Sequence, residues 1–119
     1  MTRDPELTAW LGPADAELTD AQYQRFADEV TAIIARYPLG ADDEQERTAA
    51  MSAALQWILG GTNVAAAGDD LLRTRISAAV AMAAAQQVAR MAVLDGAAEA
   101  TTARAIGLDR MTVRKVVGK

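Results

Sequence analysis

The stretch EATTARAIGLDRMTVRKVVGK, residues 99–119, determines how the rest of the chain is interpreted. Its apolar residues follow helical spacing, because Val113, Val116 and Val117 repeat at i, i+3 and i+4. This stripe is interrupted at Gly107, where glycine can adopt the positive φ that ends one helix and turns the chain. Asp109 follows as the expected N-cap of a second helix. The stretch therefore predicts two short helices joined by a tight turn.

The second predicted helix leaves one face to solvent. With its valines turned inward, the residues expected to face outward are Arg110, Met111, Arg114, Lys115 and Gly118. Arg110 lies in the first turn, where the helix dipole disfavours a cation, so its position indicates an anionic ligand. An exposed helical face with three cations near its start suits the DNA major groove and its phosphates.

These residues resemble a known class of DNA-binding segment. Ala103, Gly107 and Val113, with apolar residues between and after them, resemble the alanine, glycine and valine spacing of helix-turn-helix proteins. Residues 94–114 are similar to the DNA-binding tails of resolvase and invertase recombinases. The resemblance covers roughly residues 80–119, a third of the chain, and no recombinase catalytic domain precedes it. It therefore implies DNA binding and not recombination.

One position departs from the pattern of those tails. Ala98 stands where they usually have a Ser or Thr that caps the first helix. Either Thr101 or Asp95 could serve as the cap instead.

The DNA contacts are assigned by side-chain chemistry. Arg110, Met111 and Arg114 are predicted to reach base edges, since an arginine can bind guanine O6 and N7 through two hydrogen bonds. The residues predicted to contact phosphate are Arg104, Thr112, Lys115 and Lys119. One recognition helix covers only a few base pairs, so we expect a homodimer on half-sites about one helical turn apart.

Composition argues against an enzyme. The chain has no cysteine and no histidine, which removes disulfides, thiolate chemistry, the usual general base and the commonest zinc ligand. Its two serines, Ser52 and Ser77, fall within predicted helices. The acidic residues at 42–46 suit a solvated helix start better than a metal site. We therefore expect no catalytic residues, no cofactor and no metal.

Charge is distributed unevenly along the chain. Residues 1–70 hold 13 acidic and 4 basic residues, whereas residues 71–119 hold 3 acidic and 8 basic ones, so net charges of −9 and +5 give −4 overall. The basic half has the electrostatic character of a DNA-binding segment. The start lacks the apolar region of a signal peptide, and the long apolar run 76–94 contains Gln86, Gln87 and Arg90. We expect a soluble cytoplasmic protein without a membrane span.

Helical periodicity organises the remaining sequence. Residues 1–18 contain Asp-Pro and Gly-Pro pairs and predict an extended arm, in which Leu7, Trp10 and Leu11 either dock on the helical body or stay free. Residues 19–70 form an acidic helical region. Its first helix begins at Thr19, which has capping-box spacing with Gln22, and ends at residue 38.

Two further helices and a loop are expected before the C-terminal pair. Asp42 or Asp43 caps the second helix, which ends at residues 60–61, and residues 60–68 form a loop. Asp69 or Asp70 caps a long third helix over residues 71–94, which we expect to be the central core helix. We expect its last turns to pack on the C-terminal pair of helices. The same helix offers a dimer interface. Residues 71–119 thus form the last region.

Taken together, the patterns predict an all-α protein with a body of about three helices and a C-terminal helix-turn-helix. The favoured function is sequence-specific binding of double-stranded DNA by a small dimeric repressor or other transcriptional regulator, or by a plasmid- or phage-type DNA-binding protein. The alternative is an all-helical protein interaction module or adaptor that does not bind DNA. A small-molecule effector site between the helices stays open.

Overall fold

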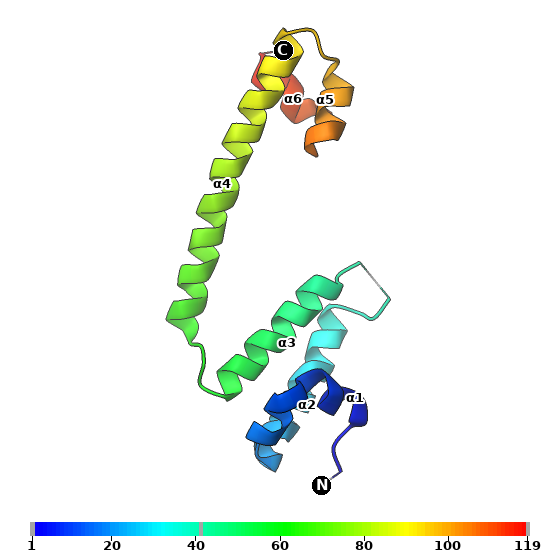
Figure 1. The fold of residues 1–119 in the computed structure, drawn as a ribbon, viewed down its shortest axis with the longest axis vertical. Coiled ribbons are helices and arrows are strands. Elements are labelled where there is room, and N and C mark those ends of the chain that lie inside the picture. The colour runs from blue at the N-terminus through cyan, green and yellow to red at the C-terminus, as the bar shows by residue number, and fades with distance from the viewer. Residues whose placement is uncertain (1, 41, 119) are drawn as a thin grey trace. The chain divides into compact units, whose positions relative to one another are not determined.

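The computed structural model describes residues 2–40 and 42–118, and all regular elements in this part of the chain are helices. Figure 1 shows them coloured in chain order. They are α1 (Pro5–Leu11), the 3₁₀ helix η1 (Gly12–Glu17), α2 (Asp20–Arg36), α3 (Glu44–Ile58), α4 (Val64–Leu94), α5 (Glu99–Ile106) and α6 (Arg110–Val117). The predicted all-α class is confirmed. Four α-helices and one 3₁₀ helix precede α5, where the sequence predicted about three helices.

The chain divides into two compact units, a first unit of Met1–Ala67 and a second unit of Gly68–Lys119. The sequence predicted a division after residue 70. Because the division falls within the first turns of α4, this helix begins in the first unit and continues into the second.

The N-terminal segment is helical, so the predicted extended arm is wrong. Asp4 caps α1 by accepting a hydrogen bond from the Glu6 N–H at 2.9 Å, and Pro5 occupies the first helical position, where its missing N–H is harmless. Gly12, at φ +58°, ends α1. The Asp-Pro and Gly-Pro pairs, which indicated irregular structure, are in fact a helix start and a helix end.

Arg3 ties this segment to the start of α2. Its guanidinium donates to the Asp15 carbonyl at 2.7 Å, the Asp15 carboxylate at 3.0 Å, the Leu18 carbonyl at 2.9 Å and the Asp20 carboxylate at 3.2 Å. It also lies 4.7 Å from the centre of the Tyr23 ring. The hydrogen bonds to Asp15 and then Asp20 raise the pKa of Arg3 above its ordinary value. No sequence pattern indicates this cluster, because its members are separated by up to twenty positions.

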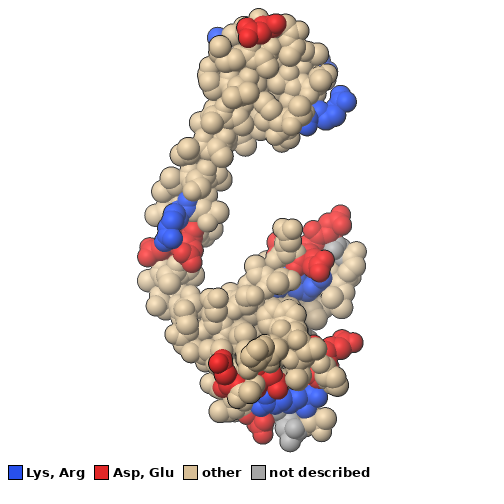
Figure 2. Space-filling model, viewed as in Figure 1, with Lys and Arg blue, Asp and Glu red and all other residues tan. Residues whose placement is uncertain are grey.

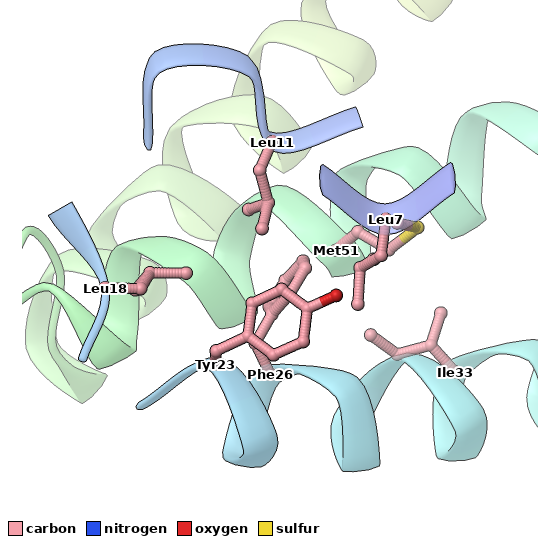
Figure 3. Close-up of a cluster of buried hydrophobic side chains, with 7 residues drawn as sticks. All are labelled: Leu7, Leu11, Leu18, Tyr23, Phe26, Ile33 and Met51. Carbon is pink, nitrogen blue, oxygen red and sulfur yellow. The ribbon is translucent and has the colours of Figure 1, made fainter. Parts of the chain in front are cut away.

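The core of the first unit forms where α1 and η1 meet α2 and α3. Figure 3 shows its buried side chains, which are Leu7, Leu11, Leu18, Tyr23, Phe26, Ile33 and Met51. Leu7 and Leu11 are therefore docked on the body, while Trp10 is partly exposed and stacks on Phe26 with ring centroids 5.7 Å apart. The predicted capping box is confirmed, since Thr19 and Gln22 exchange hydrogen bonds of 3.1 and 2.9 Å. At α3 the N-cap position is Asp43, although its side chain makes no capping hydrogen bond.

The long helix α4 begins earlier than the sequence predicted. Asn63, and not Asp69 or Asp70, caps it by accepting a hydrogen bond from the Ala66 N–H at 2.9 Å. Three alanines then extend the helix, and Gly68 lies inside it, so the predicted loop over residues 60–68 is too long. With 31 residues α4 is about 46 Å long.

Most of α4 is exposed, so the prediction that it is the central core helix is wrong. Of its residues, all of which the structure describes, Ala89 alone is buried. Its apolar composition led to that prediction, because composition does not show which other element covers a helix. By length and hydropathy α4 is also long and apolar enough to cross a membrane. One such helix is weak evidence for a membrane span, because core helices of soluble proteins pass the same test.

Candidate nucleic-acid interface

The turn between α5 and α6 follows the local signals in the sequence. Gly107 ends α5 in the left-handed conformation at φ +83°, where any other residue except Asn or Asp would be strained. The N–H groups of Gly107 and Leu108 both donate to the Ala103 carbonyl at 2.9 Å. Asp109 is the N-cap of α6, as expected, and its carboxylate accepts from the Met111 N–H at 3.1 Å rather than from Thr112.

A small core holds α5 and α6 against the last turns of α4. Val113 and Ala89 have no exposed surface and Ala103 is almost completely buried, so each helix contributes one buried apolar residue to this core. Four partly buried apolar side chains surround them, namely Val93, Ile106, Leu108 and Val117. The small alanines on α4 and α5 allow the helices to approach closely. The predicted packing of the α4 C-terminus on the pair is confirmed.

The valines of α6 do not all contribute equally to this core. Val113 is fully buried, as the periodicity predicts, whereas Val116 and Val117 are half-buried. Val117 packs on the small core, while Val116 lines a shallow surface hollow of about 300 Å³ together with Gln86, Thr112 and Lys115. Thr112 and Lys115, which are both predicted to contact phosphate, therefore lie beside the amide side chain of Gln86.

The start of α5 differs from the sequence prediction. The helix begins at Glu99 with Ala98 in the N-cap position, and no side chain forms a capping hydrogen bond there. Neither Thr101 nor Asp95 serves as the cap. Thr101 lies inside the helix and is exposed.

The predicted DNA-contacting side chains lie on the outside of this helix pair. Arg110, Met111, Arg114 and Lys115 are exposed on α6, Arg104 is exposed on α5, and Thr112 is half-buried. Lys119 lies outside the described residues. Within residues 2–40 and 42–118, no hydrogen bond or salt bridge engages the charged groups of Arg104, Arg110, Arg114 or Lys115. Figure 2 shows lysine and arginine side chains projecting from the surface of the C-terminal helices.

Arg110 occupies an electrostatically unfavourable position in the free protein, whereas Arg114 and Lys115 lie in the last turn of α6, where the helix dipole favours cations. Arg110 and Arg114 are four residues apart and therefore lie on the same face, where like charges repel. Arg110 also lies in the first turn of α6, at the positive end of the helix dipole. A bound anion would relieve both repulsions, and this is the chemistry that the exposed face offers.

Arg90 is a structural residue of this region that the sequence analysis missed. Its Nη1 donates to the Val116 carbonyl of α6 at 2.9 Å and so links the long helix to one of the terminal carbonyls of α6. The bond joins residues 26 positions apart. The only sequence signal was a charged residue within an apolar helical run.

Replacing Arg90 with methionine is expected to loosen α6 while keeping the apolar stem of the side chain. A hydrogen bond to a charged group contributes about 1.5–3 kcal/mol, so amides of α6 should exchange with solvent about tenfold to a hundredfold faster. Hydrogen exchange followed by mass spectrometry measures this. Arg75→Met, at an exposed position of the same helix, is the control, and equal effects of the two substitutions would contradict the role of Arg90.

The first unit contains a separate, wider groove of about 560 Å³. Apolar side chains from α1, α2 and α3 line much of it, including Trp10, Ile34 and Met51. Arg47 also borders it, but its guanidinium donates to the carbonyls of Tyr37 and Pro38 at 3.1 and 3.2 Å. Among the described residues, no three His, Cys, Asp or Glu side chains are grouped to hold a metal ion.

Comparison of this chain with protein-family models, with curated proteins and with solved structures finds no match.

Proposed function

We propose that this chain binds double-stranded DNA in a sequence-specific manner, with α5 and α6 acting as a helix-turn-helix and α6 as its recognition helix. One observation carries the proposal: Val113 is fully buried, which fixes the orientation of α6 and leaves the side chains of Arg110 and Arg114 in solvent. An eight-residue helix with this orientation can enter the major groove.

The exposed residues divide into two roles. Arg110 and Arg114 bind base edges, and Met111, which is 59% exposed, makes apolar contact beside them. Arg104, Thr112 and Lys115, and also Lys119, contact phosphates and position the helix on the duplex. The protein acts as a homodimeric cytoplasmic regulator, such as a repressor, or as a plasmid- or phage-type DNA-binding protein. It has neither an enzymatic activity nor a membrane span.

A second candidate function is a protein interaction module that does not bind DNA. The observation in its favour is the exposed apolar surface of α4, where nine large apolar side chains are accessible: Val64, Leu71, Leu72, Ile76, Val80, Met82, Val88, Met91 and Leu94. The same surface is compatible with a dimer of the DNA-binding protein, and it does not explain the arginines of α6.

Salt dependence separates the two candidates. If about four phosphates are neutralised per copy, and so about eight per dimer, the affinity for mixed-sequence duplex DNA should fall about 10⁴-fold between 50 and 200 mM salt. Fluorescence anisotropy of labelled random duplex fragments, titrated with the full chain at both salt concentrations, measures this. Absence of binding at 50 mM salt would contradict the proposal and favour the interaction module.

A further inference from the structure

One face of α4 carries a mainly apolar stripe that no other element of the second unit covers. Its large members are between 51% and 65% exposed, and they are Leu72, Ile76, Val80, Met91 and Leu94. Ala83, Ala84 and Gln87 complete the stripe between them. Figure 2 shows that this part of α4 carries few charged side chains. We call these eight residues the α4 stripe.

The α4 stripe is straight and is separate from the surface that α5 and α6 cover. Successive residues of an α-helix are about 100° apart, so steps of four, four and three residues keep the stripe within an arc of about 120° over about 33 Å. Ala89, which is buried beneath α5 and α6, lies about 160° from the centre of this arc. Packing within the second unit therefore leaves the stripe uncovered.

The sizes of the side chains along the α4 stripe are nearly the same when read from either end. Two alanines lie in the middle. The larger side chains on one side of them are Leu72, Ile76 and Val80, and those on the other side are Gln87, Met91 and Leu94. Two copies in opposite directions would place the alanines together, where crossing helices approach most closely, and the larger side chains outside them. The stripe is thus complementary to itself in the antiparallel direction.

We propose that a second copy of this chain covers the α4 stripe, with the two α4 helices antiparallel. In this arrangement Leu72 packs against Leu94 of the partner subunit and Ile76 against Met91 of the partner subunit. Ala83 lies next to the twofold axis. The interface is isologous, because each copy contributes the same surface.

Charged side chains near the ends of the stripe do not select the direction. Arg73 already forms a salt bridge of 3.5 Å with Asp70 of its own helix, and in the antiparallel arrangement Asp95 of the partner subunit would lie close to both of them. The antiparallel direction therefore rests on the matching sizes of the side chains along the stripe.

This dimer also has a consequence that rests on the proposed DNA binding. The twofold axis of an isologous dimer relates its two copies of α6, so the pair would read a palindromic site.

Neighbouring leucines provide a matched test of the interface. Leu72 belongs to the α4 stripe and is 59% exposed, whereas Leu71 is 51% exposed and lies about 100° away, outside it. By sedimentation equilibrium we expect the full chain to be a dimer, Leu71→Glu to remain a dimer, and Leu72→Glu to raise the dimer dissociation constant about a hundredfold or more. Circular dichroism checks that both variants retain their helix content.

Three results of this experiment would overturn the proposed dimer. The first is a wild-type chain that is monomeric at tens of micromolar, and the second is an equal rise of the dimer dissociation constant in the two variants. The third comes from adding phosphatidylglycerol vesicles to the wild-type chain: a monomer that sediments with them would show that a lipid surface covers the stripe.

Cysteine cross-linking tests the direction of the helices, because the natural chain contains no cysteine. Under mild oxidation we expect Ala83→Cys to form a covalent dimer, and Leu72→Cys mixed with Leu94→Cys to form one as well, since disulfides need Cα atoms within about 7 Å. Leu72→Cys alone should stay monomeric under denaturing conditions. A covalent dimer of Leu72→Cys alone would show parallel helices and overturn the proposed direction.

These outcomes are distinguishable from failure of the DNA-binding proposal. Salt-dependent DNA binding by a monomeric wild-type chain would refute the interface alone. A cross-linked antiparallel dimer that binds no duplex would refute the DNA-binding function alone.

Discussion

A chain that carries Arg110→Ala together with Arg114→Ala is expected to lose most of its affinity for a specific duplex and to keep its fold. Each contact with a base edge contributes about 1–3 kcal/mol, so losing two contacts from each copy should weaken binding by about 30-fold at the least. The fold should be unaffected because both side chains are exposed and neither has a charged or hydrogen-bonded partner among the described residues. Fluorescence anisotropy with a duplex selected from random DNA measures the affinity, and circular dichroism measures the helix content.

The control for this double variant must remove the same charge elsewhere. Arg25 on α2 and Arg75 on α4 are also exposed, so Arg25→Ala with Arg75→Ala changes the net charge equally. We expect this control to weaken binding less than threefold. Equal losses in the two double variants would show a non-specific effect of net charge and would contradict the assigned roles of Arg110 and Arg114.

Replacing Val113 with aspartate is expected to have the largest effect on stability. Val113 has no exposed surface and is surrounded by apolar side chains of α4 and α5, so a carboxylate there would be buried without a partner. The expected cost is about 4 kcal/mol or more, which is enough to separate α6 from the small core of the second unit. Amides of α5 and α6 should lose their protection from hydrogen exchange, and the variant should no longer bind DNA.

An exposed neighbour on the same helix provides the comparison. Met111 is 59% exposed, and Met111→Asp should leave the protection of α5 and α6 close to that of the wild type. If Val113→Asp left this protection unchanged, α6 would not be held by its buried valine.

The sequence predicted the C-terminal helices well because the signals there are local. Gly107 needed a left-handed conformation and Asp109 needed a helix start, and both requirements are met within a few residues. The contacts of Ala103 and Val113 followed from the same short periodicity, since the two residues are only ten positions apart. The prediction was less accurate for Val116. Its place among the apolar residues of α6 did not distinguish a core residue from one at the edge of a surface hollow.

Features that depend on distant residues were not predictable in this way. Arg3 and Arg90 bind carbonyls 12 to 26 positions away, and no spacing rule identifies such partners. The apolar pattern of α4 predicted a buried face, but Ala89 is the one buried residue of this helix, because periodicity shows which residues share a face and not whether another element covers it. At residues 1–18 the Pro and Gly residues predicted an irregular segment. They instead begin and end a helix, because Asp4 caps the helix that starts at Pro5.

The most direct test of DNA binding by the outer face of α6 is to titrate ¹⁵N-labelled full-length protein with duplex DNA and to follow the backbone amides by NMR. If α6 enters the major groove, the largest shifts should occur at Arg110, Met111 and Arg114, with smaller shifts at Arg104 and Lys115. Large shifts confined to the acidic first unit, with the amides of α6 unmoved at saturating DNA, would show that this helix does not read the duplex.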